Sequence, residues 1–202
     1  MAVKRILELG EQRLYAKSEA VSKSELETIK IIIEDLHDTM MDFRNRYNIG
    51  RAIAAPQIGV MKRIIYLNMG KPKILINPKL TFPDDEIMEI WDDCMSFPNL
   101  LVKVKRFKRC IIQYEDMEGK QQVMQLEGDL SELVQHEYDH LDGVLAVDHA
   151  IDNRSFALKS AMNPLPKKIG IVGGISHEST IKLYGYIHKA YYEIKMIITI
   201  QK

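Results

Sequence analysis

The chain has 202 residues, of which 46% are hydrophobic and 28% are charged. These values are typical of folded, water-soluble domains, and they exclude a wholly disordered, collagen-like or low-complexity chain. Lysine plus arginine and aspartate plus glutamate number 28 each, so the charge balance gives no electrostatic reason to expect nucleic acid or a membrane surface as a partner.

The two cysteines, Cys94 and Cys110, are too few for a disulfide framework, and the N-terminal residues lack an apolar core followed by a cleavage site. No stretch reaches the roughly 18 uninterrupted apolar residues that a membrane span needs. We therefore expect a cytoplasmic protein whose thiols are reduced and able to act as ligands.

The first predicted element is a helix that follows a short apolar strand or arm and a loop. Ser24 and Glu27 have the spacing of a capping box, which marks a helix start. Apolar residues then recur at the spacing of one buried helix face: Ile29, Ile32, Ile33, Leu36, Met40 and Phe43. The pattern predicts a helix from about Ser24 to about Arg44.

Between Arg63 and Glu127 the pattern changes to short segments rich in Ile, Val, Leu and Tyr, separated by Gly, Pro and Asp. The turn-forming stretch DMEGK joins the last two segments, RCIIQYE and QVMQLE, which indicates an antiparallel hairpin. Asp129 and Glu132 then mark the start of a second helix, whose apolar stripe ends near Gly143. These elements predict an α+β fold with partly antiparallel sheets.

The composition shifts at NPLPKK, where two prolines interrupt any regular element, and we place a domain boundary between residues 1–162 and 163–202. The segment KKIGIVGGISHESTIKLYGYIHKAYYEIK resembles the opening strand and helix of aspartate/glutamate racemases. Because the rest of such an enzyme is absent, we predict no racemase activity. The segment is either a fused or truncated gene remnant or, through its lysines, a contact for the ribosome or another partner.

The strongest chemical signal is His136-Glu137-Tyr138-Asp139-His140, an HExxH motif on the second predicted helix. A spacing of four places both imidazoles on one helix face, where they can bind one metal ion while Glu137 handles a proton on nearby water. This arrangement is typical of metallohydrolases. The alternative is a solvated helix face, because HExxH also occurs by chance.

A hydrolytic metal site needs a third protein ligand, and Cys94 is the candidate. The alternative for a cysteine is a buried structural thiol, which is the interpretation we prefer for Cys110. Upstream, the stretch GRAIAAPQIG would allow a close backbone approach, and the amide of Gln57 can donate a hydrogen bond to a developing oxyanion. A small-residue loop with a structural glutamine is the alternative there.

In this order, GRAIAAPQ, DDCMS and QHEYDHLDG resemble the three signature motifs of peptide deformylases, which remove the formyl group from the initiator methionine of nascent chains. The family patterns are GxGxAAxQ, EGCLS and QHExxH followed by leucine. The opening ILELGEQRL is also similar to the family's N-terminal segment, so the resemblance covers residues 1 to about 162. It implies a fold whose sheets pack around a central, metal-binding HExxH helix.

The resemblance implies that Cys94, His136 and His140 bind one divalent metal ion, with water as the fourth ligand. Glu137 would be the general base and then the general acid. The family metal is typically ferrous iron, and zinc or nickel can occupy the site. The resemblance implies no further cofactor.

For the substrate, the resemblance implies that the side-chain amide of Gln57 and the backbone N–H of Met95 hold the oxyanion together with the metal. The peptide would lie extended beside Gly50, Ala52 and Asp93, pairing backbone to backbone. The products would be formate and a free N-terminus.

A supporting pair is also implied by the resemblance. Asp139 resembles the family's buried aspartate beside a ligand histidine, and Arg106 aligns with an arginine that braces that region. The alternative for Arg106 is a solvated strand face.

Several positions depart from the family pattern. Ala52 stands where the family has its second glycine, and the pair Asp92-Asp93 replaces glutamate-glycine. Arg51 and Asp129 are more polar than the aliphatic residues expected near the methionine pocket.

These departures motivate one alternative, a catalytically silent deformylase-like protein that binds metal or peptide. A second alternative is a zinc endopeptidase based on HExxH alone, and the segments that contain Cys94 and Gln57 count against it. Native metal, oligomeric state and side-chain preference stay open at this stage.

Overall fold

The structure is a computed structural model that describes residues 2–162. The racemase-like segment, and with it the predicted second domain at 163–202, lies outside the described residues and stays a prediction.

Within residues 2–162 the strands form two antiparallel sheets. The larger sheet has the order β1-β2-β3-β6-β7, and the smaller has the order β4-β5-β8. The strands are β1 (Ala52–Ala54), β2 (Ile64–Asn68), β3 (Pro72–Thr81), β4 (Ile87–Asp93), β5 (Leu100–Phe107), β6 (Arg109–Glu115), β7 (Gln121–Glu127) and β8 (Phe156–Leu158).

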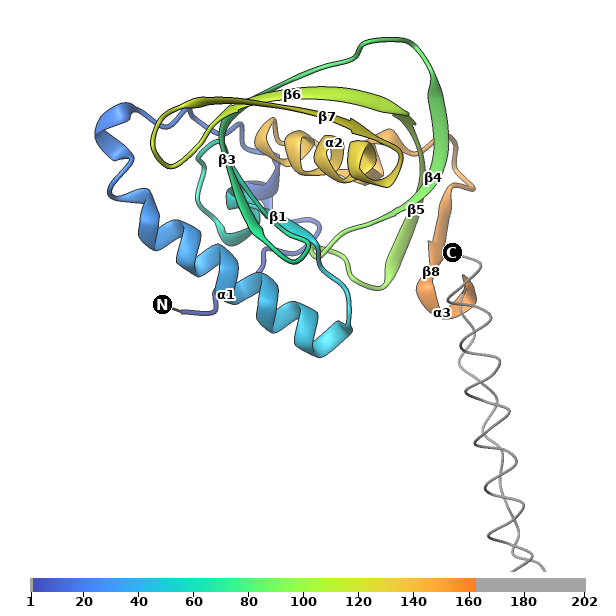
Figure 1. The fold of residues 1–202 in the computed structure, drawn as a ribbon. Coiled ribbons are helices and arrows are strands. Elements are labelled where there is room, and N and C mark those ends of the chain that lie inside the picture. The colour runs from blue at the N-terminus through green and yellow to red at the C-terminus, as the bar shows by residue number, and fades with distance from the viewer. Residues whose placement is uncertain (1, 163–202) are drawn as a thin grey trace, which may run out of the picture. The chain divides into compact units, whose positions relative to one another are not determined.

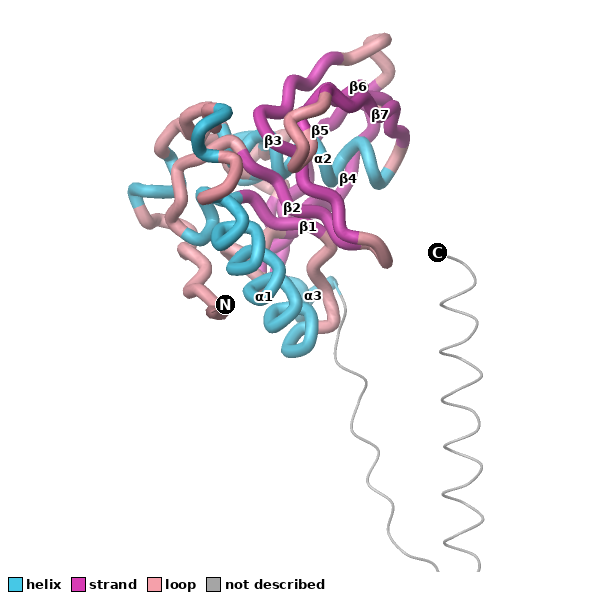
Figure 2. The backbone as a smooth tube through the Cα atoms, turned by 60° about the vertical axis from the view of Figure 1, so that its left-hand side comes forward, coloured by secondary structure: helices cyan, strands magenta, loops and turns pink. Residues whose placement is uncertain are grey.

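Two long helices take different positions relative to these sheets. The helices are α1 (Ile29–Tyr47), α2 (Asp129–Leu141) and the short α3 (Lys159–Met162). Figure 1 shows α2 in the middle of the molecule, framed by β6 and β7 on one side and by β4 and β5 on another, and α2 contacts strands of both sheets. Figure 2 shows α1 on the outside, beside β1 and β2. The predicted α+β class is confirmed, and the HExxH motif lies on the central helix.

The central position of α2 explains why its polar residues are buried. Leu133, Val134 and Leu141 pack into an apolar cluster with residues of β1, β2, β3 and β6. Because the smaller sheet covers the opposite side, His136, Glu137 and His140 are buried as well. A helix enclosed on both sides brings its polar groups into a region of low dielectric, where each of them needs a partner or a function.

The strand predictions between Arg63 and Glu127 are confirmed, including the β6–β7 hairpin. In β5 and β6 the buried residues alternate with more exposed ones, as expected for strands that turn one face to the core. The structure adds β1 and β8, which the sequence pattern did not indicate. Each has three residues, too short a run for alternation to be recognised.

The prediction that the first helix begins at Ser24 is wrong, because α1 begins at Ile29. The capping interactions belong to a separate 3₁₀ helix, Lys23–Glu25, in which the Glu25 carboxylate accepts a hydrogen bond of 2.8 Å from the Ser22 N–H. Glu25 also pairs with Lys62 at 2.8 Å. The chain contains two overlapping Ser-x-x-Glu spacings, Ser22 with Glu25 and Ser24 with Glu27. The first of them forms the cap, and its glutamate is the one that also pairs with Lys62.

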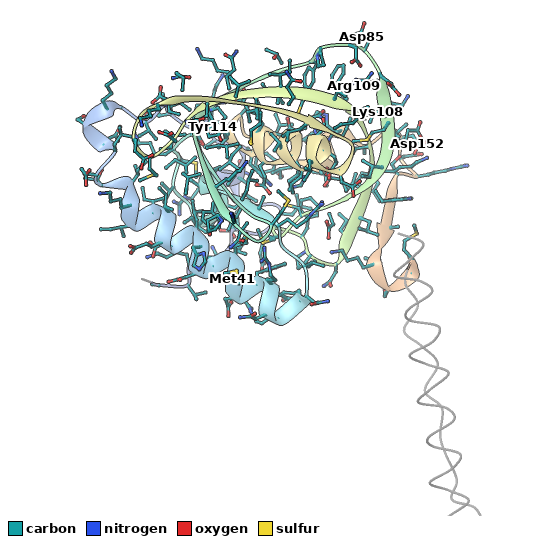
Figure 3. All side chains as sticks on the ribbon, viewed as in Figure 1. Met41, Asp85, Lys108, Arg109, Tyr114 and Asp152 are labelled. Carbon is teal, nitrogen blue, oxygen red and sulfur yellow. The ribbon has the colours of Figure 1, made fainter. Side chains whose placement is uncertain are left out.

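Ion pairs line the edge of the molecule where β4 begins. Figure 3 shows Lys108 and Arg109 at this edge. Lys108 pairs with Glu86 at 2.7 Å, and Arg109 pairs with Asp84 at 2.7 Å and with Glu86 at 2.6 Å. Both basic side chains are therefore paired with carboxylates of the segment that leads into β4.

Candidate metal centre and active site

Three predicted ligand atoms, from two distant parts of the chain, meet between the sheets. Cys94 follows the end of β4, and His136 and His140 lie one turn apart on α2. Cys94 Sγ is 3.3 Å from His140 Nε2, which is 3.2 Å from His136 Nε2. All three side chains are buried, and their ligand atoms lie within 4.8 Å of one another.

This spacing fits a tetrahedral metal ion. Zinc-type bonds of about 2.0–2.3 Å separate neighbouring tetrahedral ligands by roughly 3.3–3.6 Å. The measured separations of 3.2 and 3.3 Å are close to those values. A thiolate and two imidazoles would leave one coordination position open, which is the arrangement of catalytic sites.

The charges around the three groups also favour a cation. Burial and the neighbouring His136 lower the pKa of His140 to about 3, so its ring is neutral at pH 7. Burial opposes the charged form of His136, but the Asp92 carboxylate and the Cys94 thiolate together raise its pKa well above the usual value. The same two anions would stabilise a metal ion in place of that proton.

Behind the three groups, a chain of charged residues positions His136. Asp92 Oδ1 lies 2.8 Å from His136 Nδ1, and Asp92 Oδ2 accepts a hydrogen bond of 3.1 Å from Arg106. Arg106 also donates to Asp139, whose carboxylate lies 3.0 Å from His149 Nε2. Burial raises the pKa of Asp92, but His136 and Arg106 outweigh it and hold that pKa at about 2.

The observed contacts of Arg106 and Asp139 differ in one respect from the predicted supporting pair. Arg106 does brace the region, with its side chain buried, so the alternative of a solvated strand face is wrong. Asp139 contacts Arg106 and His149, whereas the carboxylate that contacts a predicted ligand histidine belongs to Asp92. Asp92 therefore faces the interior and not a substrate path.

Two hydrogen-bond donors lie beside the cysteine. Gln57 Oε1 accepts a hydrogen bond of 2.9 Å from the Ala54 N–H, which turns Nε2 toward Cys94 Sγ at 3.5 Å and Ser96 Oγ at 3.4 Å. These contacts are long, so the amide keeps a donor for a further acceptor. Within residues 2–162 the Met95 N–H has no hydrogen-bond partner.

Glu137 is buried next to His136 on α2. Burial raises its pKa to about 7, and the Asp92 and Glu132 carboxylates add to the effect of burial while His136 opposes it. Its Oε2 has no hydrogen-bond partner among the described residues. A carboxyl group with a pKa near neutrality can both accept and donate a proton at pH 7.

Cys94, His136, Glu137 and Gln57 line a cavity of about 260 Å³. The sequence-predicted residues on its wall are Gly50, Ala52, Gln57, Asp93, Cys94, Met95, His136 and Glu137. Asp129, which was expected near the methionine pocket, is exposed and lies outside this wall. Arg51 is on the wall, and so is a residue that the site prediction missed, Glu132.

Sequence reasoning missed the contacts of three residues. Glu132 was interpreted as a helix-start signal, although its position four residues before His136 places both on one helix face. Asp92 directly precedes Asp93 on a strand, so one of the pair had to face inward, but the sequence does not say which. His149 approaches Asp139 only through the tertiary fold, and no sequence signal would have found it.

A family model described as polypeptide deformylase matches residues 3–156. Peptide deformylase 1 of Prochlorococcus marinus (strain MIT 9313) is 36% identical over 168 residues, covering 77% of this chain and 85% of the relative. A peptide deformylase of Pseudothermotoga lettingae is 35% identical and covers 79% of this chain and 90% of the relative.

Among solved structures, the crystal structure of peptide deformylase from Thermotoga maritima is similar, with a TM-score of 0.69 and 31% sequence identity, and the match covers 75% of this chain and 100% of that one. Within residues 2–162, no helix combines the length and the apolar composition that crossing a bilayer would need.

Proposed function

This chain belongs to the peptide deformylase family, and we propose that it removes the N-formyl group from the initiator methionine of nascent polypeptides and releases formate. The observation that carries the proposal is the convergence of Cys94, His136 and His140 beside the buried carboxyl group of Glu137.

Cys94, His136 and His140 would hold one divalent metal ion. We propose ferrous iron, with zinc or nickel as substitutes, since a donor set of one thiolate and two imidazoles suits all three. When bound, the ion would supply Lewis acidity, which activates water and stabilises negative charge.

The residues around the metal site would divide the remaining work. Glu137 accepts a proton from the attacking water and passes it to the leaving amine, which its pKa of about 7 favours. Gln57 Nε2 and the Met95 N–H donate hydrogen bonds to the oxyanion that forms on the formyl group. The arginine between Asp92 and Asp139 keeps the orientation of His136 fixed.

The substrate peptide would lie along Gly50, Ala52 and Asp93, which line the cavity. A nascent chain as substrate makes the cytoplasm the place of action. A contact of the lysines beyond residue 162 with the ribosome or another partner stays a prediction, and a fused or truncated gene remnant stays its alternative. We propose neither direct recognition of a nucleic-acid sequence nor a membrane partner.

The test is release of formate from a formyl-Met tripeptide by protein prepared anaerobically with iron. Wild type is compared with Glu137→Gln and with Glu127→Gln, an exposed carboxyl group outside the cavity. We expect Glu137→Gln to retain its metal and to lose about 10²–10⁴-fold in kcat, and Glu127→Gln to behave as wild type.

Two outcomes would overturn the proposal. A metal-loaded wild type that releases no formate would support the catalytically silent alternative. Cleavage of an internal peptide bond without deformylation would support an endopeptidase.

A further inference from the structure

β7 is an edge strand whose outer side carries unpaired backbone groups. Within residues 2–162 it is the last strand of the five-stranded sheet and pairs with β6 alone. At the two ends of this ladder, the Asp116 N–H donates to the Lys120 carbonyl, and the Gly128 N–H donates to the Lys108 carbonyl. Lys120, Gly128 and the even-numbered residues between them therefore turn their backbone groups toward β6. The odd-numbered residues turn theirs outward, and these are Gln121, Val123, Gln125 and Glu127.

This outer edge lacks the usual protection of an edge strand. In the described part of the chain, no hydrogen bond reaches the backbone N–H or C=O of the four outward residues. Natural edge strands are protected by proline, a bulge or charged side chains. β7 contains no proline, its register with β6 has no bulge, and Glu127 is its one charged residue. The apolar Val123 side chain is 59% exposed. A further strand can therefore join β7.

An apolar groove of about 510 Å³ lies beside the inner face of β7. Figure 1 shows β7 beside α2, and both contribute to its walls. Met124 and Leu126 line the groove, because the even-numbered side chains of β7 turn toward the core. A strand joined to β7 would direct every second side chain to this same face. The groove would receive those side chains against apolar residues that include Leu67, Met69, Leu130 and Val134.

Two lysines give the groove a positive rim. Lys71 and Lys73 line the groove and are exposed. Among residues 2–162 neither of them forms an ion pair, and the Lys73 Nζ atom donates to the thioether of Met124 at 3.3 Å. A thioether is a weak acceptor, so both ammonium groups are available to carboxylates. The charge of the rim favours an acidic occupant.

The same charges argue against a second copy of β7 as the occupant. A second copy would direct its own even-numbered residues to the groove, and these are Lys120, Gln122, Met124 and Leu126. This set contains no carboxylate. It would add a lysine beside Lys71 and Lys73, and like charges at short distance repel one another.

We propose that the outer edge of β7 and this groove bind an extended peptide segment of a partner protein, antiparallel to β7. Two apolar side chains of the segment enter the groove, and acidic side chains on the same face pair with Lys71 and Lys73. Backbone hydrogen bonds to β7 supply affinity, and the groove supplies selectivity. The groove and the active-site cavity share Leu133 alone, so the inference goes beyond the proposed deformylation and does not depend on it.

The first experiment measures the binding of a synthetic peptide to the metal-loaded protein by fluorescence polarisation. The probe is Asp-Thr-Leu-Thr-Leu-Thr-Asp with fluorescein on its N-terminus, which places both leucines and both aspartates on one face of a strand. It carries no formyl group and is not a substrate. The matched control replaces both aspartates with lysine. We expect the aspartate peptide to bind at least about tenfold more tightly than the lysine peptide.

N-methylated versions of the aspartate peptide test the backbone ladder. In the proposed register the N–H groups of the threonines point toward β7, and those of the leucines point away from it. Methylation of the central threonine nitrogen should weaken binding by about tenfold or more, because it removes a hydrogen bond and adds a steric clash. Methylation of the first leucine nitrogen should have a much smaller effect.

Protein variants test the edge and the rim separately. Val123→Pro removes one outward N–H without breaking the ladder to β6 and should weaken binding, whereas Val123→Thr keeps that N–H and should bind as wild type. Lys71→Glu combined with Lys73→Glu should reverse the preference between the two peptides. Lys79→Glu, an exposed charge on β3 outside the groove, should leave it unchanged. Urea unfolding establishes that each variant is folded.

The inference is overturned if folded wild type does not bind the aspartate peptide at about 1 mM. It is also overturned if the two methylated peptides bind equally well, or if Val123→Thr loses as much binding as Val123→Pro. Concentration-dependent dimerisation that Val123→Pro abolishes, measured by analytical ultracentrifugation, would identify a second copy as the occupant instead.

Discussion

Replacing Arg106 with methionine should destabilise the protein strongly. Its side chain is 4% exposed and lies between the Asp92 and Asp139 carboxylates. Methionine fills much of the same space but leaves these two carboxylates close together without the cation. Because both carboxylates are largely buried, water cannot compensate them.

The expected loss can be estimated from the remaining partners. Removing one member of a buried ion pair costs about 3–5 kcal/mol in unfolding free energy. Asp92 keeps His136 at 2.8 Å and Asp139 keeps His149 at 3.0 Å. We therefore expect a loss near the lower end, about 3 kcal/mol.

The measurement is urea unfolding followed by circular dichroism. Lys105→Met is the matched control, since Lys105 precedes Arg106 on β5 and faces solvent, and it should change stability by less than about 0.5 kcal/mol. Arg106→Lys should restore only part of the loss, because one ammonium group does not reproduce the two-sided fork of a guanidinium.

The reasoning would be refuted if Arg106→Met unfolded at the same urea concentration as wild type. A second readout is metal affinity, which should fall by about 10–100-fold because Asp92 then orients His136 less firmly. A stability loss without a change in metal affinity would confine Arg106 to a structural role.

Three further predictions concern residues outside the cavity. Gly143→Ala should lower the unfolding free energy by about 1–3 kcal/mol, because Gly143 has φ +72° and an added Cβ would lie 2.6 Å from the Tyr15 carbonyl carbon; urea unfolding would show this. Burial raises the pKa of the Cys110 thiol, so in a Cys94→Ser variant no thiol should react with Ellman's reagent until urea unfolds the protein. Hydrogen bonds from Lys62 and from the backbone and side chain of Ser22 lower the pKa of Glu25 from 4.5 to about 2. The stabilisation is therefore present above pH 4.5 and is lost as the pH falls toward 2, and Glu25→Gln should reduce the slope of stability against pH over that range.

The sequence predicted the elements whose signal is local. The spacing of four in HExxH places two imidazoles on one face of any helix, so the approach of His136 to His140 follows once the helix forms. The strands between Arg63 and Glu127 were recognised because each has enough residues to show its pattern. The start of α1 was not recognised correctly, because two Ser-x-x-Glu spacings overlap before it. The spacing that forms a cap, Ser22 with Glu25, also has a tertiary partner, Lys62.

Only those residues of the candidate site that belong to a sequence motif could be predicted. Cys94 lies 42 residues before His136 in the chain, and only the resemblance connected the two. The orientation of Asp92 toward His136, and of Asp93 away from it, depends on which face of β4 meets α2. That choice is made by the packing of two sheets around one helix, which no local pattern encodes.

The two buried glutamates of α2 pose the same energetic problem but have different explanations. Burial raises the pKa of both Glu132 and Glu137 to about 7; the Asp92 carboxylate adds to this effect for both groups, and Glu132 adds to it for Glu137. For Glu137 the proposed proton transfer accounts for this unfavourable environment, because catalysis needs a carboxyl group that is uncharged part of the time.

Proton transfer does not account for Glu132, whose carboxyl group lies within 4.8 Å of the ligand atoms of Asp92 and His136 and 3.8 Å from Arg51. Leucine at that position would pack against the neighbouring apolar residues without any desolvation penalty. Glu132→Leu should therefore raise the free energy of unfolding, and urea unfolding followed by circular dichroism measures the change. A variant less stable than wild type would show instead that the interactions of Glu132 with His136, Arg106 and Arg51 outweigh the cost of burying its carboxyl group.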